Sequence, residues 1–350
     1  MEIIEDVVIV GAGIAGLTTS LGLHRLGIRS LVLESSETLR ITGFAFTTWS
    51  NAWRALDAIG IGESLRHQHY LMTSIVVAST FLEKPISEIS FDGRELRCLQ
   101  RRSLLETLAK ELPDGTIRFS SKVVSVDESS GYFKRVHLAD GTILKTKVLI
   151  GCDGINSVVT KWLDLKKPAF TGRSAIREEE MEDDPVKLKQ FATSMMQDTS
   201  EEMRSIVEKT SPDNVVSSPL RYRKPWELLW GDISKGNVCV AGDALHPMTP
   251  DLGQGGCLAL EDGVVLARCL GEALLKPGKV EEEYERIEKG LRRFAQERRW
   301  RSFDVIATAF VVGFIQQSDG KTMNYLRDNF LLKFLSRLLL RKADFDCGKL

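Results

Sequence analysis

The N-terminal part of the chain contains two short apolar runs separated by a stretch with helical spacing. Residues 6–10 and 30–34 are apolar runs typical of buried parallel strands, and residues 14–26 repeat their apolar positions with the period of a helix. Gly27 follows this stretch and is a natural end for a helix. The pattern predicts one βαβ unit, whose right-handed crossover places both strands in the same parallel sheet.

Further along the chain the period changes from helical to alternating. Residues 122–151 alternate around the turn signal Asp140-Gly141, which predicts an antiparallel meander that returns as a buried strand. Residues 238–241 predict another buried strand. Residues 257–275 and 281–303 have helical spacing, and the second stretch carries many Arg and Glu residues, which we expect on a solvent-exposed face.

Composition and charge restrict the kind of protein. Of the 350 residues 43% are hydrophobic and 27% charged, as in a soluble globular protein with a sizeable core. The formal net charge of −1 argues against nucleic acid as the main partner, because phosphate binding needs an excess of Lys and Arg. The longest apolar run, residues 305–315, is too short to cross a bilayer.

The cysteines and histidines show no metal-ligand or redox spacing. We therefore expect no metal centre and no disulfides. This usage favours a cytoplasmic protein, or an organellar one if a targeting segment has been removed.

The turn after the first strand carries a complete G-x-G-x-x-G motif. Gly11 permits a tight turn, Gly13 lets backbone amides approach a pyrophosphate, and Gly16 allows the helix to pack closely on the strand. Glu34 ends the second strand and can accept hydrogen bonds from a ribose hydroxyl. The motif predicts a dinucleotide site and does not distinguish FAD from NAD. It occurs once, so a second dinucleotide would have to bind without its own Rossmann unit.

A second glycine-rich segment covers residues 242–256. A buried strand ends at Gly242-Asp243, and a loop with Pro250 then leads through Gly253, Gln254, Gly255 and Gly256 into a new helix. Asp243 could bind a polyol hydroxyl, and the glycines would let backbone amides meet a flat ring. The positive end of the following helix would face negative charge that develops there.

Several of these segments resemble motifs of the single-component flavoprotein aromatic hydroxylases, the p-hydroxybenzoate hydroxylase type. Residues 242–256 are similar to the G-D motif of that family and residues 151–157 to its D-G motif, which serves both FAD and nicotinamide. Residues 99–105 resemble its flavin-contacting segment, with Arg101 at the matching position. Residues 51–60 are typical of plant FAD-dependent monooxygenases related to 3-hydroxybenzoate 6-hydroxylase and zeaxanthin epoxidase.

The resemblance implies an α/β fold: an FAD-binding Rossmann-like three-layer domain of the glutathione reductase and p-hydroxybenzoate hydroxylase type, an inserted, shortened β-rich substrate domain, and C-terminal helices. The expected parts are a discontinuous FAD-binding domain of residues 1–69, 99–164 and 231–303, a substrate-side domain of 70–98 and 165–230, and a C-terminal segment of 304–350. The implied FAD-contacting residues are Gly11, Gly13, Ile14, Ala15, Gly16, Glu34, Arg101, Asp153, Gly154, Gly242, Asp243, Pro250, Gly253, Gln254, Gly255 and Gly256.

The implied function is that of an FAD-dependent monooxygenase. NAD(P)H would reduce FAD, and a flavin C4a-hydroperoxide formed with O2 would hydroxylate or epoxidise a small aromatic or isoprenoid-type substrate. The sequence identifies no catalytic acid or base, no oligomeric state and no choice between NADH and NADPH. The alternatives are an FAD protein without hydroxylase activity, such as an NAD(P)H oxidase, a nicotinamide-binding regulator, and a flavin reductase of isoprenoid double bonds.

The chain departs from the family pattern in two places. Residues 155–241, between the D-G and G-D motifs, number only 87, whereas the relatives carry several more strands there. Ser157 is followed by Val158, Val159 and Thr160 where the family usually has an arginine, although Lys161 is close by. The first departure predicts a shortened substrate side.

A few other residues have weaker signals. His246 is expected to have a structural role in its loop, with a catalytic base as the alternative. Trp226 and Trp230 are expected to pack in the core or on a sheet, with the lining of a substrate pocket as the alternative. Arg40 could be a further cofactor contact or an ordinary surface residue. Residues 330–341 predict a C-terminal helix packed on the protein, with peripheral membrane contact as the alternative.

Overall fold

The computed structural model describes residues 3–40, 45–78, 85–91, 93–128, 132–178, 185–196, 201–211, 215–318, 320 and 338–350. Its strands are β1 Ile3–Val10, β2 Leu31–Leu33, β3 Ala45–Thr48, β4 Ser74–Ala78, β5 Pro85–Ser90, β6 Arg97–Gln100, β7 Ile117–Arg118, β8 Val123–Glu128, β9 Lys134–Leu138, β10 Ile143–Gly151, β11 Ala169–Glu178, β12 Val215–Tyr222, β13 Ser234–Lys235 and β14 Val238–Val240.

Its helices are α1 Ile14–Arg25, α2 Ser50–Ala58, α3 Gly62–Arg66, α4 Arg101–Lys110, α5 Val158–Trp162, α6 Pro185–Met195, α7 Glu201–Lys209, α8 Glu227–Trp230, α9 Gly255–Leu274 and α10 Val280–Gln317. Short 3₁₀ turns are η1 Gly154–Asn156, η3 Gly242–Ala244 and η4 Pro250–Leu252.

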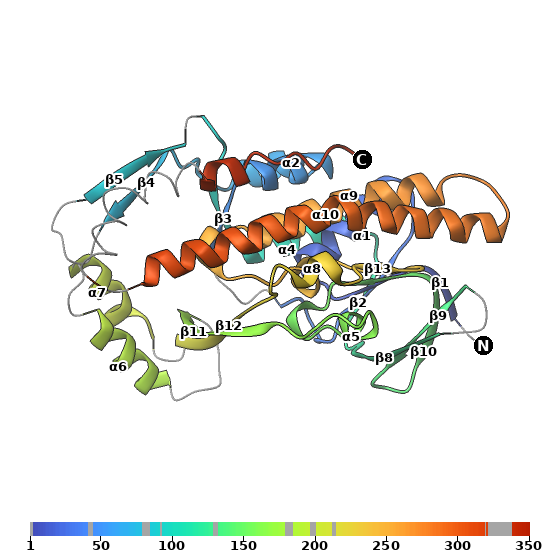
Figure 1. Ribbon diagram of the computed structural model, residues 1–350, viewed down its shortest axis with the longest axis horizontal. Helices are drawn as coiled ribbons and strands as arrows, with labels where there is room; N and C mark the ends of the chain where they lie inside the picture. The colour runs from blue at the N-terminus through green and yellow to red at the C-terminus, as the bar shows by residue number, and fades with distance from the viewer. Residues whose placement is uncertain are drawn as a thin grey trace.

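A central sheet with the strand order β13-β14-β10-β1-β2-β7 forms the middle layer. The strands β14, β10, β1, β2 and β7 run parallel, as the predicted βαβ unit requires. Val7, Val8 and Ile9 of β1 have no exposed surface, and β9 of the meander pairs with β10 of this sheet. This confirms the α/β fold class (Figure 1).

Helices α1 and α9 pack against each other at small residues. A Cβ on Gly22 of α1 would stand 2.7 Å from the Cβ of Ala267, and one on Gly263 of α9 would stand 2.5 Å from a methyl carbon of Thr18. Larger side chains at these glycines would push the helices apart. The close approach holds the helix that follows the first motif against the helix that follows the second.

The predicted meander is confirmed, since β8 pairs with β9 and β9 with β10 in antiparallel register. Gly141 turns the chain between β9 and β10 with φ +84°, and the Oδ1 of Asp140 accepts a hydrogen bond of 2.8 Å from the amide of Thr142. The turn at residues 129–131 lies outside the described residues.

Outside the central sheet the strands form three separate two-stranded sheets, β3-β6, β4-β5 and β11-β12. The ladders of the described residues do not join these sheets to one another. Helices α6 and α7 lie near β11 and β12, at the end of the molecule opposite the meander (Figure 1).

Two expectations about side chains need correction. The Arg and Glu residues of 281–303 were expected on a solvent-exposed face, and Arg292 and Arg293 are exposed, but Arg298 and Arg301 are 0% and 9% exposed. Trp226 and Trp230 were expected to pack, but they are 55% and 85% exposed.

The C-terminal third is dominated by α10, which is longer than residues 281–303. It continues through the apolar run, where Val305, Ile306, Ala309 and Val312 are buried. Of the predicted helix 330–341, residues 330–337 lie outside the described residues, and residues 338–342 are helical. Among the described residues, no helix has the length and apolarity that crossing a membrane requires.

Candidate functional site

Three glycine-containing loops follow the carboxyl ends of the neighbouring parallel strands β1, β10 and β14 and contact one another. A Cβ on Gly11 would stand 2.5 Å from the carbonyl oxygen of Cys152. A Cβ on Gly242 would stand 2.8 Å from the Cβ of Ala15. Open α/β sheets bind ligands at this end. The fold therefore brings together the predicted segments 11–16, 151–157 and 242–256, which are far apart in the sequence.

The start of α1 is open in front of Gly13. This glycine is the N-cap residue, no side chain caps the helix there, and a Cβ on it would meet no atom within 4 Å. The amides of the first turn and the positive end of the helix dipole are suited to a pyrophosphate. Gly16, one turn later, is enclosed, because its Cβ would collide with the carbonyl oxygen of Gly11.

Glu34 lies beside this helix start and is 7% exposed. Its carboxylate accepts hydrogen bonds of 2.9 Å from the amide of Ala12 and 3.0 Å from the amide of Ser36. Burial alone would raise its pKa, but these amides and the guanidinium of Arg40, 3.6 Å away, hold the pKa of Glu34 below its ordinary value. Glu34 is thus an ionised acceptor with remaining lone pairs at the place where a ribose would lie.

Arg101 lies beside Arg40, the residue that neighbours Glu34. Its Nη1 donates a hydrogen bond of 2.6 Å to the carbonyl oxygen of Arg40. Burial among protein groups raises the pKa of Asp243, although its side chain is exposed, and the nearby His246 and Arg101 oppose that rise. Glu34 accepts a hydrogen bond from the amide of Ala12, and Gly242, next to Asp243, packs against Ala15, so both predicted acids flank the start of α1.

The D-G loop lies against the first motif. The Oδ2 of Asp153 accepts a hydrogen bond of 2.7 Å from the amide of Val158, whereas its Oδ1 is buried without a hydrogen-bond partner among the described residues. Burial raises the pKa of Asp153. Ser157 accepts a 2.9 Å hydrogen bond from the amide of Thr160 and thereby caps α5, which presents Lys161 to solvent.

The loop from Pro250 to Gly256 lies over β3. Gly253 has φ +61°, in the left-handed region, and a Cβ on it would stand 3.6 Å from the Nε1 of Trp49. A Cβ on Gly256 would stand 2.6 Å from the ring of Phe46, so this position also requires glycine. Gln254 precedes the first turn of α9, whose axis points at the loop.

Several polar atoms around this loop are buried without a hydrogen-bond partner in the described part of the chain. They are the Nε1 of Trp49, the Oγ1 of Thr249 and the Nε2 of Gln254. Unsatisfied buried donors are costly, and a ring with polar edges would satisfy them. The open start of α1, the acids and these donors fit the nucleotide, polyol and ring portions of FAD.

The sequence analysis missed a buried charge network beneath the loop. The Nδ2 of Asn51 donates to the Oε1 of Gln254 at 2.9 Å and to the Oε1 of Glu261 at 2.6 Å. Glu261 in turn pairs with Arg298 and Arg301 of α10 at 2.7 Å. In the sequence, this network is indicated by the two adjacent acids Glu261 and Asp262, which lie inside an otherwise largely apolar helix.

Asp262 holds the G-D motif through the same network. Its Oδ2 accepts hydrogen bonds from the amide of Gly242 at 2.7 Å and from the Nε2 of His246 at 2.6 Å, and its Oδ1 accepts one from Arg298 at 2.6 Å. Burial opposes ionisation, but His246 and Arg298 lower the pKa of Asp262 to about 2. His246 is fully buried in this contact, which confirms its expected structural role.

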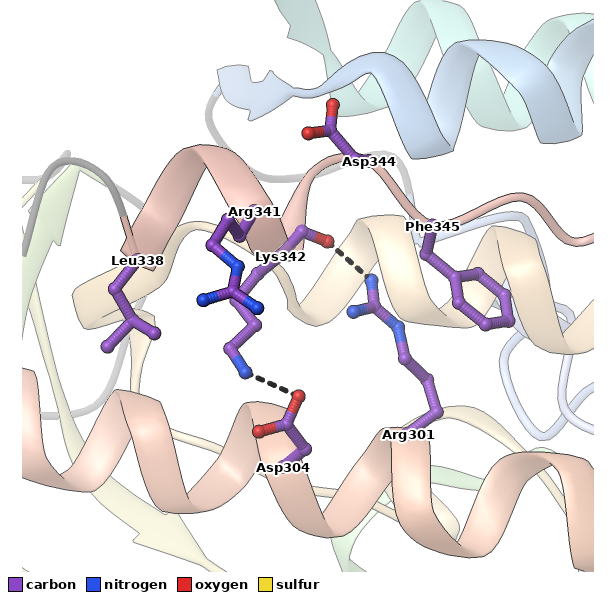
Figure 2. A pocket seen from close by; sticks show the side chains of 7 residues that line it. All are labelled: Arg301, Asp304, Leu338, Arg341, Lys342, Asp344 and Phe345. Carbon is purple, nitrogen blue, oxygen red and sulfur yellow. Dashed lines mark hydrogen bonds and ion pairs between the residues drawn. The ribbon is translucent and has the colours of Figure 1, made fainter.

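The C-terminal segment packs against Arg298 and Arg301 of this network, and Figure 2 shows its contacts with Arg301. Arg301 donates a hydrogen bond of 2.8 Å to the carbonyl oxygen of Lys342, and the ring of Phe345 lies 4.6 Å from its guanidinium. A pocket of about 380 Å³ lies here, lined by Arg301, Asp304, Leu338, Arg341, Lys342, Asp344 and Phe345. No predicted cofactor residue lines it, so this pocket is separate from the candidate site.

The two-stranded sheet β11-β12 is fastened to the same loops. Arg173 of β11 pairs with Asp251 at 2.9 Å and 3.2 Å, and a Cβ on Gly313 of α10 would stand 2.5 Å from that carboxylate. Arg223, directly after β12, is fully buried and donates to the carbonyl oxygens of Leu245 at 2.7 Å and of Ala244 at 3.0 Å. The sheet is thus anchored at two places in the segment 242–256.

Replacing Arg173 with glutamine is expected to lower the free energy of unfolding by about 1–3 kcal/mol, because the carboxylate of Asp251 would stay in place without its partner. Denaturant unfolding measures this change, and FAD titration should show weaker binding. Arg292→Gln is the matched control, since Arg292 pairs with Glu288 at the surface and should contribute less than about 0.5 kcal/mol. Equal effects of the two substitutions would contradict the anchoring role.

Comparison with known proteins agrees with this geometry. A family model described as FAD binding domain matches residues 5–224 and 189–287. Monooxygenase 2 of Arabidopsis thaliana is 52% identical over 400 residues, covering 99% of this chain and 98% of that protein. 3-Hydroxybenzoate 6-hydroxylase 1 of Aquipseudomonas alcaligenes is 26% identical, covering 88% and 89%.

Solved structures share the fold. HpxO of Klebsiella pneumoniae complexed with FAD and uric acid superposes with a TM-score of 0.80 at 18% identity, covering 98% of this chain and 96% of that one.

The alignment with Monooxygenase 2 spans 400 positions whereas this chain has 350 residues, so that relative contains residues without a counterpart here. The family match over most of the chain and the identity to a curated monooxygenase show that this protein belongs to the FAD binding domain family, among the FAD-dependent monooxygenases.

Proposed function

We propose that this protein uses NAD(P)H and O2 to hydroxylate or epoxidise a small aromatic or isoprenoid-type substrate at a flavin held between its two glycine-rich motifs. The observation that supports the proposal is that both acids flank the start of α1: Glu34 accepts a hydrogen bond from the amide of Ala12, and Gly242, next to Asp243, packs against Ala15.

Each part of the site has a role in this proposal. Glu34 binds the adenosine ribose, and the backbone from Gly13 to Gly16 binds the pyrophosphate. Asp243, Asp153 and Arg101 bind the polyol and its neighbourhood. Pro250 and residues 253–256 border the ring. Residues 70–98 and 165–230 form the substrate side, and the remainder of residues 1–303 forms the FAD-binding part.

Bound FAD would supply the redox chemistry, accepting a hydride and passing electrons to O2. The residues of the chain bind the ring, stabilise its negative charge and exclude water. The amides at the start of α9 face the ring from Gly255 and Gly256, and the helix dipole adds positive potential. Leu252 and Trp49 are 2% and 3% exposed and keep this region dry, which oxygen transfer requires.

Anaerobic titration tests the proposal directly. The purified protein should be yellow, with a flavin spectrum that NADH or NADPH bleaches. Oxygen should then restore the spectrum. With a correct substrate, the oxygenated product should account for most of the NAD(P)H consumed. A protein that yields only H2O2 with every compound tested would be an oxidase, and one without flavin absorption would refute the cofactor assignment.

Replacing Gly253 with valine is expected to abolish FAD binding or flavin reduction, because a β-branched residue is strained at φ +61° and its side chain would approach Trp49. Flavin content and the rate of NAD(P)H-dependent bleaching measure the effect. Gly93→Val is the matched control, since Gly93 has φ +76° but faces open space. It should cost a similar amount of stability while leaving the flavin spectrum unchanged.

A further inference from the structure

The two tryptophans of helix α8 stand out from the surface. Trp230 is 85% exposed and Trp226 is 55% exposed, although indole rings usually contribute to stability by being buried. Helix α8 is firmly placed below the middle of α10 (Figure 1), because Arg299 donates hydrogen bonds to the carbonyl oxygens of Leu228 and Gly231. The exposure of the two indoles is therefore a property of a fixed element.

Three lysines belong to the segments next to α8. Lys166 and Lys167 are exposed, and Lys224 is half-buried. The turn 165–167 lies beside α8, because Arg223 donates a hydrogen bond of 2.7 Å to the carbonyl oxygen of Lys166. A Cβ on Gly231 would also stand 2.5 Å from a methyl carbon of Leu165.

Acidic residues do not cancel this charge. Glu227 of α8 is 12% exposed and lies 4.0 Å from the guanidinium of Arg223, which compensates it. Asp164 is exposed next to Leu165, so it offsets one of the three lysines. Asp232, after α8, is exposed too, and the guanidinium of Arg299 lies near enough to compensate it. We name Lys166, Lys167, Lys224, Trp226 and Trp230 the α8 patch.

We propose that the α8 patch docks the protein on an anionic membrane surface. Tryptophan lies at the headgroup level of bilayers, and lysines nearby are attracted to anionic lipids. Protein interfaces are depleted of lysine at their centres, whereas Trp230 is 85% exposed and three lysines lie in the segments next to its helix. A soft, negatively charged surface therefore fits the patch better than a protein partner.

Sedimentation of the FAD-loaded protein with vesicles tests the proposal. It should bind vesicles of phosphatidylcholine mixed with phosphatidylglycerol, bind poorly to phosphatidylcholine alone, and dissociate when salt is raised. Trp226→Ser with Trp230→Ser should lower the partition coefficient roughly tenfold or more, and Lys166→Gln with Lys167→Gln should do the same. Their flavin spectra and unfolding curves should be unchanged, because all four side chains are on the surface.

The control is Lys276→Gln with Lys279→Gln, which removes the same charge from the exposed α9–α10 connection. If this control lowers vesicle binding as much as the lysine pair of the patch, net charge alone explains the attraction and the proposal is wrong. Absence of vesicle binding would overturn it too. So would a concentration-dependent dimer that Trp230→Ser dissociates, since the patch would then be a protein interface. These readouts do not depend on turnover, so they stand whether or not the proposed monooxygenase reaction is found.

Discussion

Replacing Gly13 with alanine is expected to remove FAD binding while leaving the protein folded. Gly13 has an ordinary φ of −81° and open space before it, so an added methyl group strains nothing in the protein itself. The same methyl would occupy the place of the pyrophosphate. Losing about two hydrogen bonds to charged oxygens costs ~3 kcal/mol, which is roughly a hundredfold in Kd.

Fluorescence titration with FAD measures this loss, and circular dichroism with thermal unfolding of the FAD-free protein checks the fold. Gly16→Ala serves as the contrasting variant, because its methyl would collide with the carbonyl oxygen of Gly11. It should lose both FAD binding and stability. Unchanged FAD affinity in Gly13→Ala would show that the phosphates bind elsewhere.

Replacing Asp262 with asparagine is expected to lower the free energy of unfolding by about 3–5 kcal/mol, because Glu261 alone would then face both Arg298 and Arg301, and the buried network would hold one uncompensated positive charge. The amide of Gly242 and His246 would lose an anionic acceptor in the same step. The G-D motif should then be less well held, and FAD should bind more weakly. Asp304→Asn is the control, since its ion pair with Lys342 is half-exposed and should contribute less than about 1 kcal/mol.

The pH dependence of stability gives an independent check on Asp262. Its pKa in the folded protein is about 2, below the ordinary value of 3.8, so its ionised form stabilises the fold. This contribution is fully present above about pH 4 and is lost as the pH falls through 2. The difference in unfolding free energy between wild type and Asp262→Asn should therefore shrink across this window. A difference that stays constant down to pH 2 would argue against an ionised Asp262.

Sequence patterns predicted the parts of the fold that depend on local spacing. The βαβ unit around Gly11 to Gly16 and the meander before Gly151 combine strand periodicity with turn glycines, and both are in the structure. That the G-x-G-x-x-G motif and the G-D motif lie together in space could be expected only from the resemblance to the flavoprotein hydroxylases. The structure supplies their physical contact, such as Gly242 against Ala15.

The residues that support the site could not be predicted, because their partners are distant in sequence. Arg298 and Arg301 resembled an exposed basic face, yet they pair with acids 36 and 40 positions earlier in α9. Periodicity reports which residues share a helix face and not what that face contacts. The same limit explains Trp226 and Trp230, which hydrophobicity alone assigned to the interior.

A structure of the FAD-loaded protein tests the central claim most directly. We expect one FAD per chain, with its adenosine ribose on Glu34, its phosphates at Gly13, its ribityl chain near Asp243 and its ring beside residues 250–256. A cofactor that contacts only one of these two acids, or whose ring lies away from Gly253, would contradict the account.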